Sequence, residues 1–166
     1  MNNYIGISED RLHHILGVAR ESYQIAKDKG YDEVFCKKMF MIGWNHDVGY
    51  EFAKEQTEHP QISSEMVHSL VCINKIYDTP ISTKTNHAIN YHGCYPDKSI
   101  KDNKEWIILN IADLTIDSKG NKVDIMQRLE DIKNRYGSNQ YLTACDIAVQ
   151  VGLIDRNSIE RNIDGG

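Results

Sequence analysis

Apolar residues recur at the spacing of an α-helix along most of this sequence, and no segment shows the sustained alternation of a half-buried β-strand. Near the N-terminus, Ile15, Val18 and Ala19 fall within one arc of a helix, whereas charged side chains occupy the opposite arc. Short polar or glycine-containing segments divide the pattern into pieces of ordinary helix length. The sequence therefore predicts an all-α fold.

Cap and turn residues set the expected helix ends. The hydroxyl of Ser8 can cap the first helix, and Gly30 suits the left-handed conformation that closes it. Asp32 can begin the second helix, and Pro60 or the serines at 63 and 64 can open the third. The expected helices cover residues 8–30, 32–46, 60–78, 82–93, 103–117, 124–136 and 141–151.

These helices fit one domain, because 166 residues leave little room for a second core. A hydrophobic share of 40% with 26% charged residues is typical of a globular chain rather than a disordered one. Acidic side chains outnumber basic ones by 24 to 19, and the net charge of −5 argues against broad binding to a phosphate backbone. We expect a single compact domain over residues 1–166 and no nucleic-acid partner.

No segment has the sequence of a membrane helix or a secretory signal. The apolar run Met39–Trp44 has six residues, far fewer than the ~20 that a membrane helix needs, so we expect no membrane partner. The N-terminus lacks a basic start and an apolar stretch, which favours a cytoplasmic location and reduced thiols. The cysteines include no Cys-x-x-Cys pair, so we expect small buried hydrophobic residues at Cys36, Cys72, Cys94 and Cys145.

Several polar residues lie on or beside apolar helix faces. His14 lies at the edge of the first apolar arc and needs partners for its ring nitrogens, whereas His13 lies among charges and should face water. His46 ends the core stripe of the second helix, and Asp47 follows it directly. Asp113 lies in a very apolar stretch, where an unpaired buried carboxylate would cost on the order of several kcal/mol. Unless it faces water, this carboxyl group should be protonated, paired with a cation or bound to a metal.

Two imidazoles and two carboxylates on separate helices form a mixed nitrogen and oxygen shell. Such a shell suits divalent iron, manganese, cobalt, nickel or zinc, and suits magnesium less because of the imidazoles. We therefore predict a metal site formed by His14, His46, Asp47 and Asp113.

The order of these four residues, a histidine, an adjacent His-Asp pair and a distant aspartate, resembles the signature of the HD superfamily of metal-dependent phosphohydrolases. The resemblance covers about residues 8–118 and implies an all-α, HD-type domain with the metal site between helices. Residues 119–166 would then form a helical cover. Three stretches carry further similarity: Arg11–Ala19 resembles the family's R-x-x-H-x-x-G-V-A, Asn45–Gly49 its H-D-h-G, and Ile111–Asp113 its closing A-D.

Dinuclear members of this superfamily place two more histidines before the last aspartate. His59, followed by proline, resembles the family's H-P word, and His92, after Ala-Ile-Asn-Tyr, resembles its A-I-x-x-H. His87 lies about 140° from His92 around a helix, and His68 has no matching word, so we expect both to be solvated. The resemblance thus implies that His59 and His92 belong to a second metal site that shares Asp47 with the first.

The resemblance implies a phosphohydrolase that cleaves a nucleotide or a related phosphate ester through a metal-activated water. Among its subgroups, the small dinuclear enzymes that split dinucleoside polyphosphates are the most similar. One or two divalent ions and a small phosphorylated substrate follow as cofactor and partner, whereas the oligomeric state stays open. The same shell is compatible with an HD-type di-iron oxygenase, and a non-catalytic nucleotide-binding HD domain is a further alternative.

Catalytic support must come from charged residues near these ligands. Arg11 lies three residues before His14 and can attract an anionic ester, a role that Lys54 and Lys119 could share. Glu51, one turn beyond Asp47, and Glu55 are candidates for positioning a water. The loop at residues 117–121 follows Asp113 closely and could line the mouth of the pocket.

Overall fold

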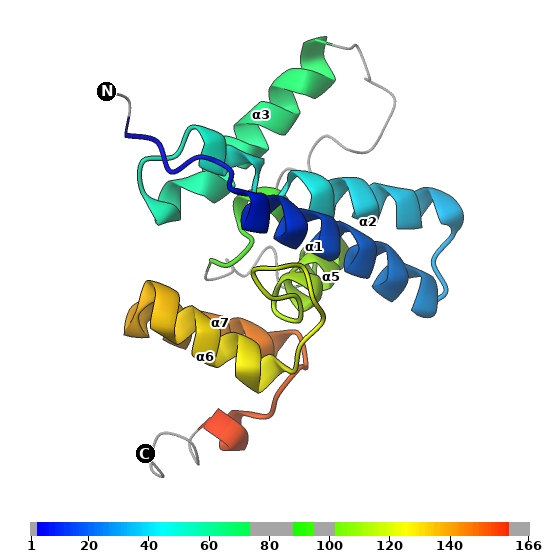
Figure 1. Cartoon of the computed structure of the whole chain (residues 1–166). Coiled ribbons are helices and arrows are strands. Elements are labelled where there is room, and N and C mark those ends of the chain that lie inside the picture. Colours follow the sequence, from blue (N-terminus) through cyan, green and yellow to red (C-terminus); the bar gives the residue numbers. More distant parts are fainter. Residues whose placement is uncertain (1–2, 74–87, 95–101, 160–166) are drawn as a thin grey trace.

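The computed structural model describes residues 3–73, 88–94 and 102–159. These residues contain no β-strand, and the antiparallel bridge between Ile116 and Lys122 is isolated, so the prediction of an all-α fold is confirmed. None of the helices in this part of the chain is long and apolar enough to cross a membrane. The helices labelled in Figure 1 are α1 (Glu9–Asp28), α2 (Glu33–Asn45), α3 (His59–Ile73), α5 (Lys104–Asp113), α6 (Ile125–Tyr136) and α7 (Ser138–Gln150), and two 3-10 helices, η1 (Val48–Glu51) and η2 (Gln56–Glu58), precede α3.

Three helices begin where their cap residues predict. Ser8 Oγ accepts the backbone N–H of Arg11 at 3.1 Å, and Asp32 Oδ1 accepts that of Phe35 at 2.8 Å. Asp124 caps α6 in the same way. Each cap satisfies a backbone donor that has no partner inside its helix.

Other boundaries differ from the predicted ones. Helix α5 ends at Asp113 rather than at residue 117, because the chain turns back through Thr115 toward the isolated bridge. Helix α7 begins at Ser138 rather than at residue 141, directly after Gly137, whose φ of 86° is unfavourable for other residues. Helix α3 begins at His59, one residue before Pro60. Residues 82–87 of the helix predicted over residues 82–93 lie outside the described residues, and residues 88–90 are helical.

Helices α1 and α2 form an antiparallel pair (Figure 1). They approach closely at Gly43, where an added Cβ would lie 2.7 Å from the Cα of Ala19. Helix α5 packs against both, and its Ile108 and Leu109 join Met39 of α2 in one buried cluster. Cys36 is buried in this cluster, as predicted.

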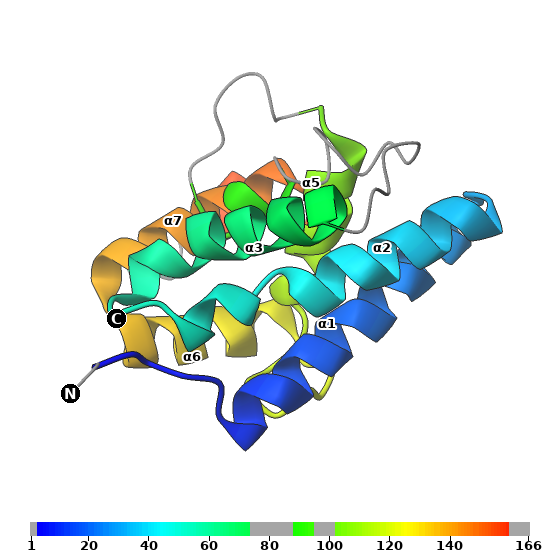
Figure 2. The same ribbon diagram turned by 90° about the horizontal axis from the view of Figure 1, so that it is seen from above.

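Helices α6 and α7 form a second pair, and α5 lies between the two pairs (Figures 1 and 2). A second buried cluster joins Trp106 and Leu114, from α5 and its end, to Leu129, Ile132 and Ile147. Helix α5 therefore has one side in each core. Its C-terminal end, with Asp113, lies where the two pairs of helices meet a cavity of about 280 Å³.

Candidate metal centre

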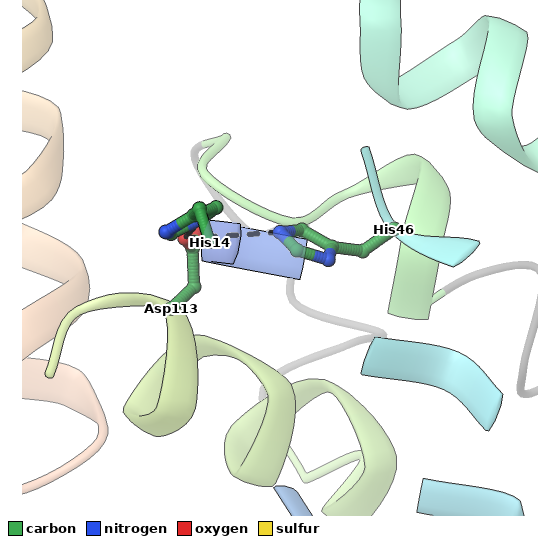
Figure 3. Close-up of side chains that lie close together, drawn as sticks. All are labelled: His14, His46 and Asp113. Carbon is green, nitrogen blue, oxygen red and sulfur yellow. Dashed lines mark hydrogen bonds and ion pairs between the residues drawn. The ribbon is translucent and has the colours of Figure 1, made fainter. Parts of the chain in front are cut away.

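Three predicted ligands meet at the junction of α1, α2 and α5. Figure 3 shows the rings of His14 and His46 and the carboxylate of Asp113 turned toward one another. Asp113 Oδ1 lies 3.0 Å from His14 Nε2 and 3.8 Å from His46 Nε2. Both rings are at most 2% exposed, so the three donor atoms meet in the interior and could hold a metal ion.

A second group forms around the carboxylate of Asp47, the residue that precedes η1. Asp47 Oδ1 lies 3.2 Å from Nε2 of both His59 and His92, and these two nitrogens are 3.0 Å apart. The same oxygen lies 3.5 Å from His46 Nε2, and Asp47 Oδ2 lies 3.9 Å from His14 Nε2. The structure thus brings all six predicted ligands into one continuous cluster, with Asp47 between its two groups.

The other nitrogen of each ring fixes its orientation. In all four histidines Nδ1 faces a backbone carbonyl oxygen, which only accepts hydrogen bonds, so Nδ1 must carry the proton. A neutral ring of this kind presents the lone pair of Nε2 to the cluster. The carbonyl partners are those of Asp117 for His14 (2.8 Å), Gly43 for His46 (2.6 Å), Gln56 for His59 and Ile89 for His92.

The cluster therefore contains hydrogen-bond acceptors that face one another. When all four rings are neutral, four Nε2 lone pairs and two carboxylates meet at distances of 3.0 to 3.9 Å, where acceptors repel. Among the described residues, Nε2 of His46 is buried without any hydrogen-bond partner. A cation would give each of these atoms a partner, and this mixed set of donors suits a divalent transition metal. The residues present thus fit the metal that the sequence predicts.

Burial and the neighbouring charges shift the pKa values of His46, Asp47 and Asp113 toward the forms that bind a metal, and that of His92 toward the protonated form. Burial lowers the pKa of His46 to about 4, so this ring is neutral at neutral pH. Burial alone would raise the pKa of Asp47 and Asp113, but the imidazoles around them hold both values well below the ordinary range. Burial would likewise lower the pKa of His92, but its hydrogen bond to Asp47 raises it. A metal at this position would compete with that proton.

Helix α5 holds His92 in place from outside the cluster. Asn110 Oδ1 accepts the backbone N–H of Gly93 at 3.0 Å, and Trp106 Nε1 donates to the carbonyl of Tyr91 at 2.9 Å. Both bonds fix the turn that carries His92, and both side chains are buried. Sequence reasoning treated Asn110 and Trp106 only as parts of an apolar stretch.

The start of α3 holds His59 against η1. The rings of His59 and Tyr50 stack with centroids 4.0 Å apart, and the backbone N–H of Gly49 donates to Ser63 Oγ at 2.8 Å. An added Cβ at Gly49 would lie 2.5 Å from the backbone nitrogen of Ser63, so only glycine allows this approach. The glycine of the His-Asp-Val-Gly stretch thus lets α3 reach the ligand Asp47.

Two guanidinium groups border the cavity beside the ligands. Arg11 Nη1 donates to Asp47 Oδ2 at 2.9 Å, Nη2 donates to the hydroxyl of Tyr136 at 3.3 Å, and the group lies 4.0 Å from the ring centroid of Tyr50. Arg128 Nη2 lies 3.8 Å from Asp113 Oδ1. Both arginines line the cavity, so an anion entering it meets positive charge next to each carboxylate ligand.

Sequence reasoning missed Arg128 and assigned α6 to a cover over the core. The spacing of residues 128, 132 and 136 by four places them on one face of the helix, and this pattern is visible in the sequence. All three line the cavity. Helices α6 and α7 are therefore more than a cover, because they form one wall of the site.

The other predicted charged residues lie elsewhere. Glu51, Lys54 and Glu55 are exposed and are not among the residues that line the cavity. Lys119 and its loop do not line it either, although the carbonyl of Asp117 orients His14. Cys94 is half-buried and does line the cavity, which differs from the fully buried position expected for it. His68 is exposed, as expected, whereas His87 lies outside the described residues.

Comparison with known proteins adds no assignment. No protein-family model, no curated protein and no solved structure matches this chain. The interpretation of the cluster therefore depends on its donor atoms, its cavity and the charges beside it.

Proposed function

We propose that this chain is a metal-dependent phosphohydrolase of the HD type that hydrolyses a nucleotide or a related phosphate ester. The observation that carries the proposal is the convergence of four imidazole Nε2 atoms and two carboxylates, all acceptors, beside a cavity that two arginines border. The acceptors call for cations, and the arginines favour an anionic substrate.

The shape of the cluster supports two ions rather than one. His14, His46 and Asp113 form one group of donors, and Asp47 and His92 form a second group that shares His46 and lies beside His59. Each group offers enough donors for one ion if Asp47 contributes an oxygen to both. Iron, manganese, cobalt, nickel and zinc are the candidates, and magnesium is disfavoured by the four imidazoles.

The protein's own residues bind and orient the substrate. A bound divalent ion supplies Lewis-acid chemistry, lowering the pKa of water and neutralising charge on phosphoryl oxygens. Arg11 and Arg128 place positive charge beside those oxygens, which offsets the carboxylates of a chain that is acidic overall. The stacked ring of Tyr50 keeps Arg11 beside Asp47. Serine or cysteine nucleophiles are not needed in this scheme.

The far wall of the cavity supports an organic ester rather than an inorganic phosphate. Leu114, Ile132 and Ile147 give this wall apolar surface, and Gln140 and Thr143 add polar groups. An apolar surface with a few polar groups is typical of a pocket that binds and orients an organic ligand. A nucleoside or a similar group attached to the phosphate fits this combination.

Metal analysis and a phosphate-release screen test the proposal. Protein purified without chelator should contain close to two metal ions per chain, and should release phosphate from nucleotides when manganese, iron or cobalt is added. His14→Ala should lose metal and activity, whereas the matched change His13→Ala, on the exposed side of the same helix, should keep both.

Other outcomes would contradict the proposal. An Asp47→Ala variant with wild-type phosphate release would refute it. Oxygen consumption by the iron-loaded protein without phosphate release would indicate the oxygenase alternative. Nucleotide binding with neither reaction would indicate a non-catalytic domain.

A further inference from the structure

Arg128 is a buried cation whose hydrogen-bonding capacity is only partly used. The residue is 7% exposed, and it lies on α6 beside the end of α5. Its Nη1 donates to Asp131 Oδ2 at 3.0 Å, and its Nε donates to the backbone carbonyl of Asp113 at 3.3 Å. These bonds hold the guanidinium group in one orientation.

The remaining nitrogen of this group has no hydrogen bond within the described part of the chain. Arg128 Nη2 approaches Asp113 Oδ1 only to 3.8 Å, which is an ion-pair contact and too long for a hydrogen bond. Because Arg128 lines the cavity, its free N–H groups are available to a ligand there. A guanidinium held on two sides and open on the third is suited to bind an anion.

We propose that Arg128 is a phosphate-binding residue that holds the phosphoryl group of the substrate next to the Asp113 side of the metal cluster. This inference rests on the proposed function for the nature of the anion. The planar guanidinium matches the oxygens of a phosphoryl group, and burial strengthens such charge-assisted bonds.

Arg128 suits this role better than Arg11 does. Arg11 already donates from both terminal nitrogens, to Asp47 and Tyr136, and stacks on Tyr50, so each terminal nitrogen has a partner and one face is covered. Arg128 is positioned instead by Asp131, whose other oxygen accepts a bond from Arg135 Nε at 2.6 Å. Asp131 thus holds Arg128 from the surface of α6 without occupying the cavity, and Arg135 itself makes no contact with Arg128 among the hydrogen bonds of this helix.

Isothermal titration calorimetry with inorganic phosphate tests the assignment. Full-length protein loaded with manganese is compared with Arg128→Gln and with the matched control Arg135→Gln, which lies on the same helix, contacts the same aspartate and does not line the cavity. Arg128→Gln should raise the dissociation constant for phosphate about tenfold or more, since a charge-assisted hydrogen bond is lost. Arg135→Gln should change it less than about threefold.

Metal content and thermal unfolding show whether the site survives each change. A dissociation constant in Arg128→Gln within about twofold of wild type, with metal content unchanged, would overturn the inference. Should Arg128→Gln fail to fold, Arg128→Lys replaces it, because it keeps the charge without the planar group. Lysine should weaken phosphate binding severalfold, and an unchanged constant would overturn the inference equally.

The two proposals fail in different ways. If phosphate binding depends on Arg128 but no ester is hydrolysed with any added metal, the proposal of a phosphate site is supported and the proposal of a phosphohydrolase is refuted. If Asp47-dependent hydrolysis occurs and phosphate binding is the same with and without Arg128, the proposal of a phosphohydrolase is supported and the role of Arg128 in phosphate binding is refuted.

Discussion

Gly49→Ala should separate the two halves of the ligand cluster. The added methyl group would lie 2.5 Å from the backbone nitrogen of Ser63 and 2.7 Å from its Oγ, and it would also contact the carbonyl of His59. An ordinary contact begins at 3.4 Å, so η1 and α3 must move apart by at least about 0.9 Å at Ser63 and by more at the carbonyl of His59, which is closer. That shift would lengthen the 3.2 Å separation of Asp47 Oδ1 and His59 Nε2 to about 4 Å if it fell along that line.

The energetic cost has two parts. Forcing one methyl group into a packed contact costs about 1–3 kcal/mol. Losing the bond from Gly49 N–H to Ser63 Oγ leaves a buried donor without an acceptor, which costs about 1–3 kcal/mol more. For a chain of this length each kcal/mol lowers Tm by about 2–4 °C, so Tm should fall by roughly 4–24 °C.

Thermal unfolding and metal analysis check both consequences. Metal sites tolerate deviations of only about 0.2 Å, so Gly49→Ala should also retain fewer ions than the wild type. Gly30→Ala is the matched control, because its Cβ meets open space and only its φ of 80° costs about 1–2 kcal/mol. If Gly49→Ala had the Tm of Gly30→Ala and full metal content, the packing of α3 on η1 would not be what holds His59.

Three further predictions follow from other contacts. Metal added at a hundredfold excess over its Kd should stabilise the folded chain by about 2.7 kcal/mol and raise Tm by about 5–11 °C in differential scanning fluorimetry, and a chelator should reverse the rise. Asn110→Ala should lower Tm by roughly 2–12 °C, because the buried N–H of Gly93 loses its acceptor, which costs about 1–3 kcal/mol of folding free energy. The same variant should weaken metal binding, because the turn that carries His92 is no longer held. An unchanged metal affinity would contradict this prediction. Hydrogen bonds from the backbone N–H of Lys54 and Glu55 lower the pKa of Glu58, so its charge stabilises the fold above its unfolded pKa of about 4.3 and ceases to do so as pH falls through the lower folded pKa. The stability difference between wild type and Glu58→Gln should therefore shrink between about pH 6 and pH 3, and a constant difference would count against the role of this charge.

The sequence predicted the helices and four of the candidate ligands because both depend on local patterns, whereas His59 and His92 were predicted only from the resemblance to the HD superfamily. Helical spacing and cap residues act over a few residues, so α1, α2 and α6 begin where expected. The ligands also stand out locally, since His14 and Asp113 are polar residues within apolar arcs. The resemblance to the HD superfamily rests on the same residues and stays a prediction.

Features that depend on tertiary packing could not be predicted in this way. Arg128 and Asn110 act only because α6 packs near the end of α5 and the turn at residues 91–93 packs against α5. Glu51 has the spacing of a ligand neighbour, but the short 3-10 turn of η1 leaves it exposed. The end of α5 was expected four residues too late, because the chain leaves the helix at Leu114 and Ile116 pairs with Lys122 in the isolated bridge.

The origin of the donors links metal binding to the fold itself. They come from α1, the end of α2, the residue after it, the start of α3, the turn at residue 92 and the end of α5. Without a cation these segments meet through acceptor atoms that repel one another. A bound cation would give acceptors from different segments the same partner. A cation would therefore stabilise contacts between segments far apart in sequence, whereas the packing within each helix pair would gain little. Chelation should consequently loosen the start of α3 and the turn at residue 92 before it unfolds the α1–α2 pair, an order that hydrogen exchange can resolve.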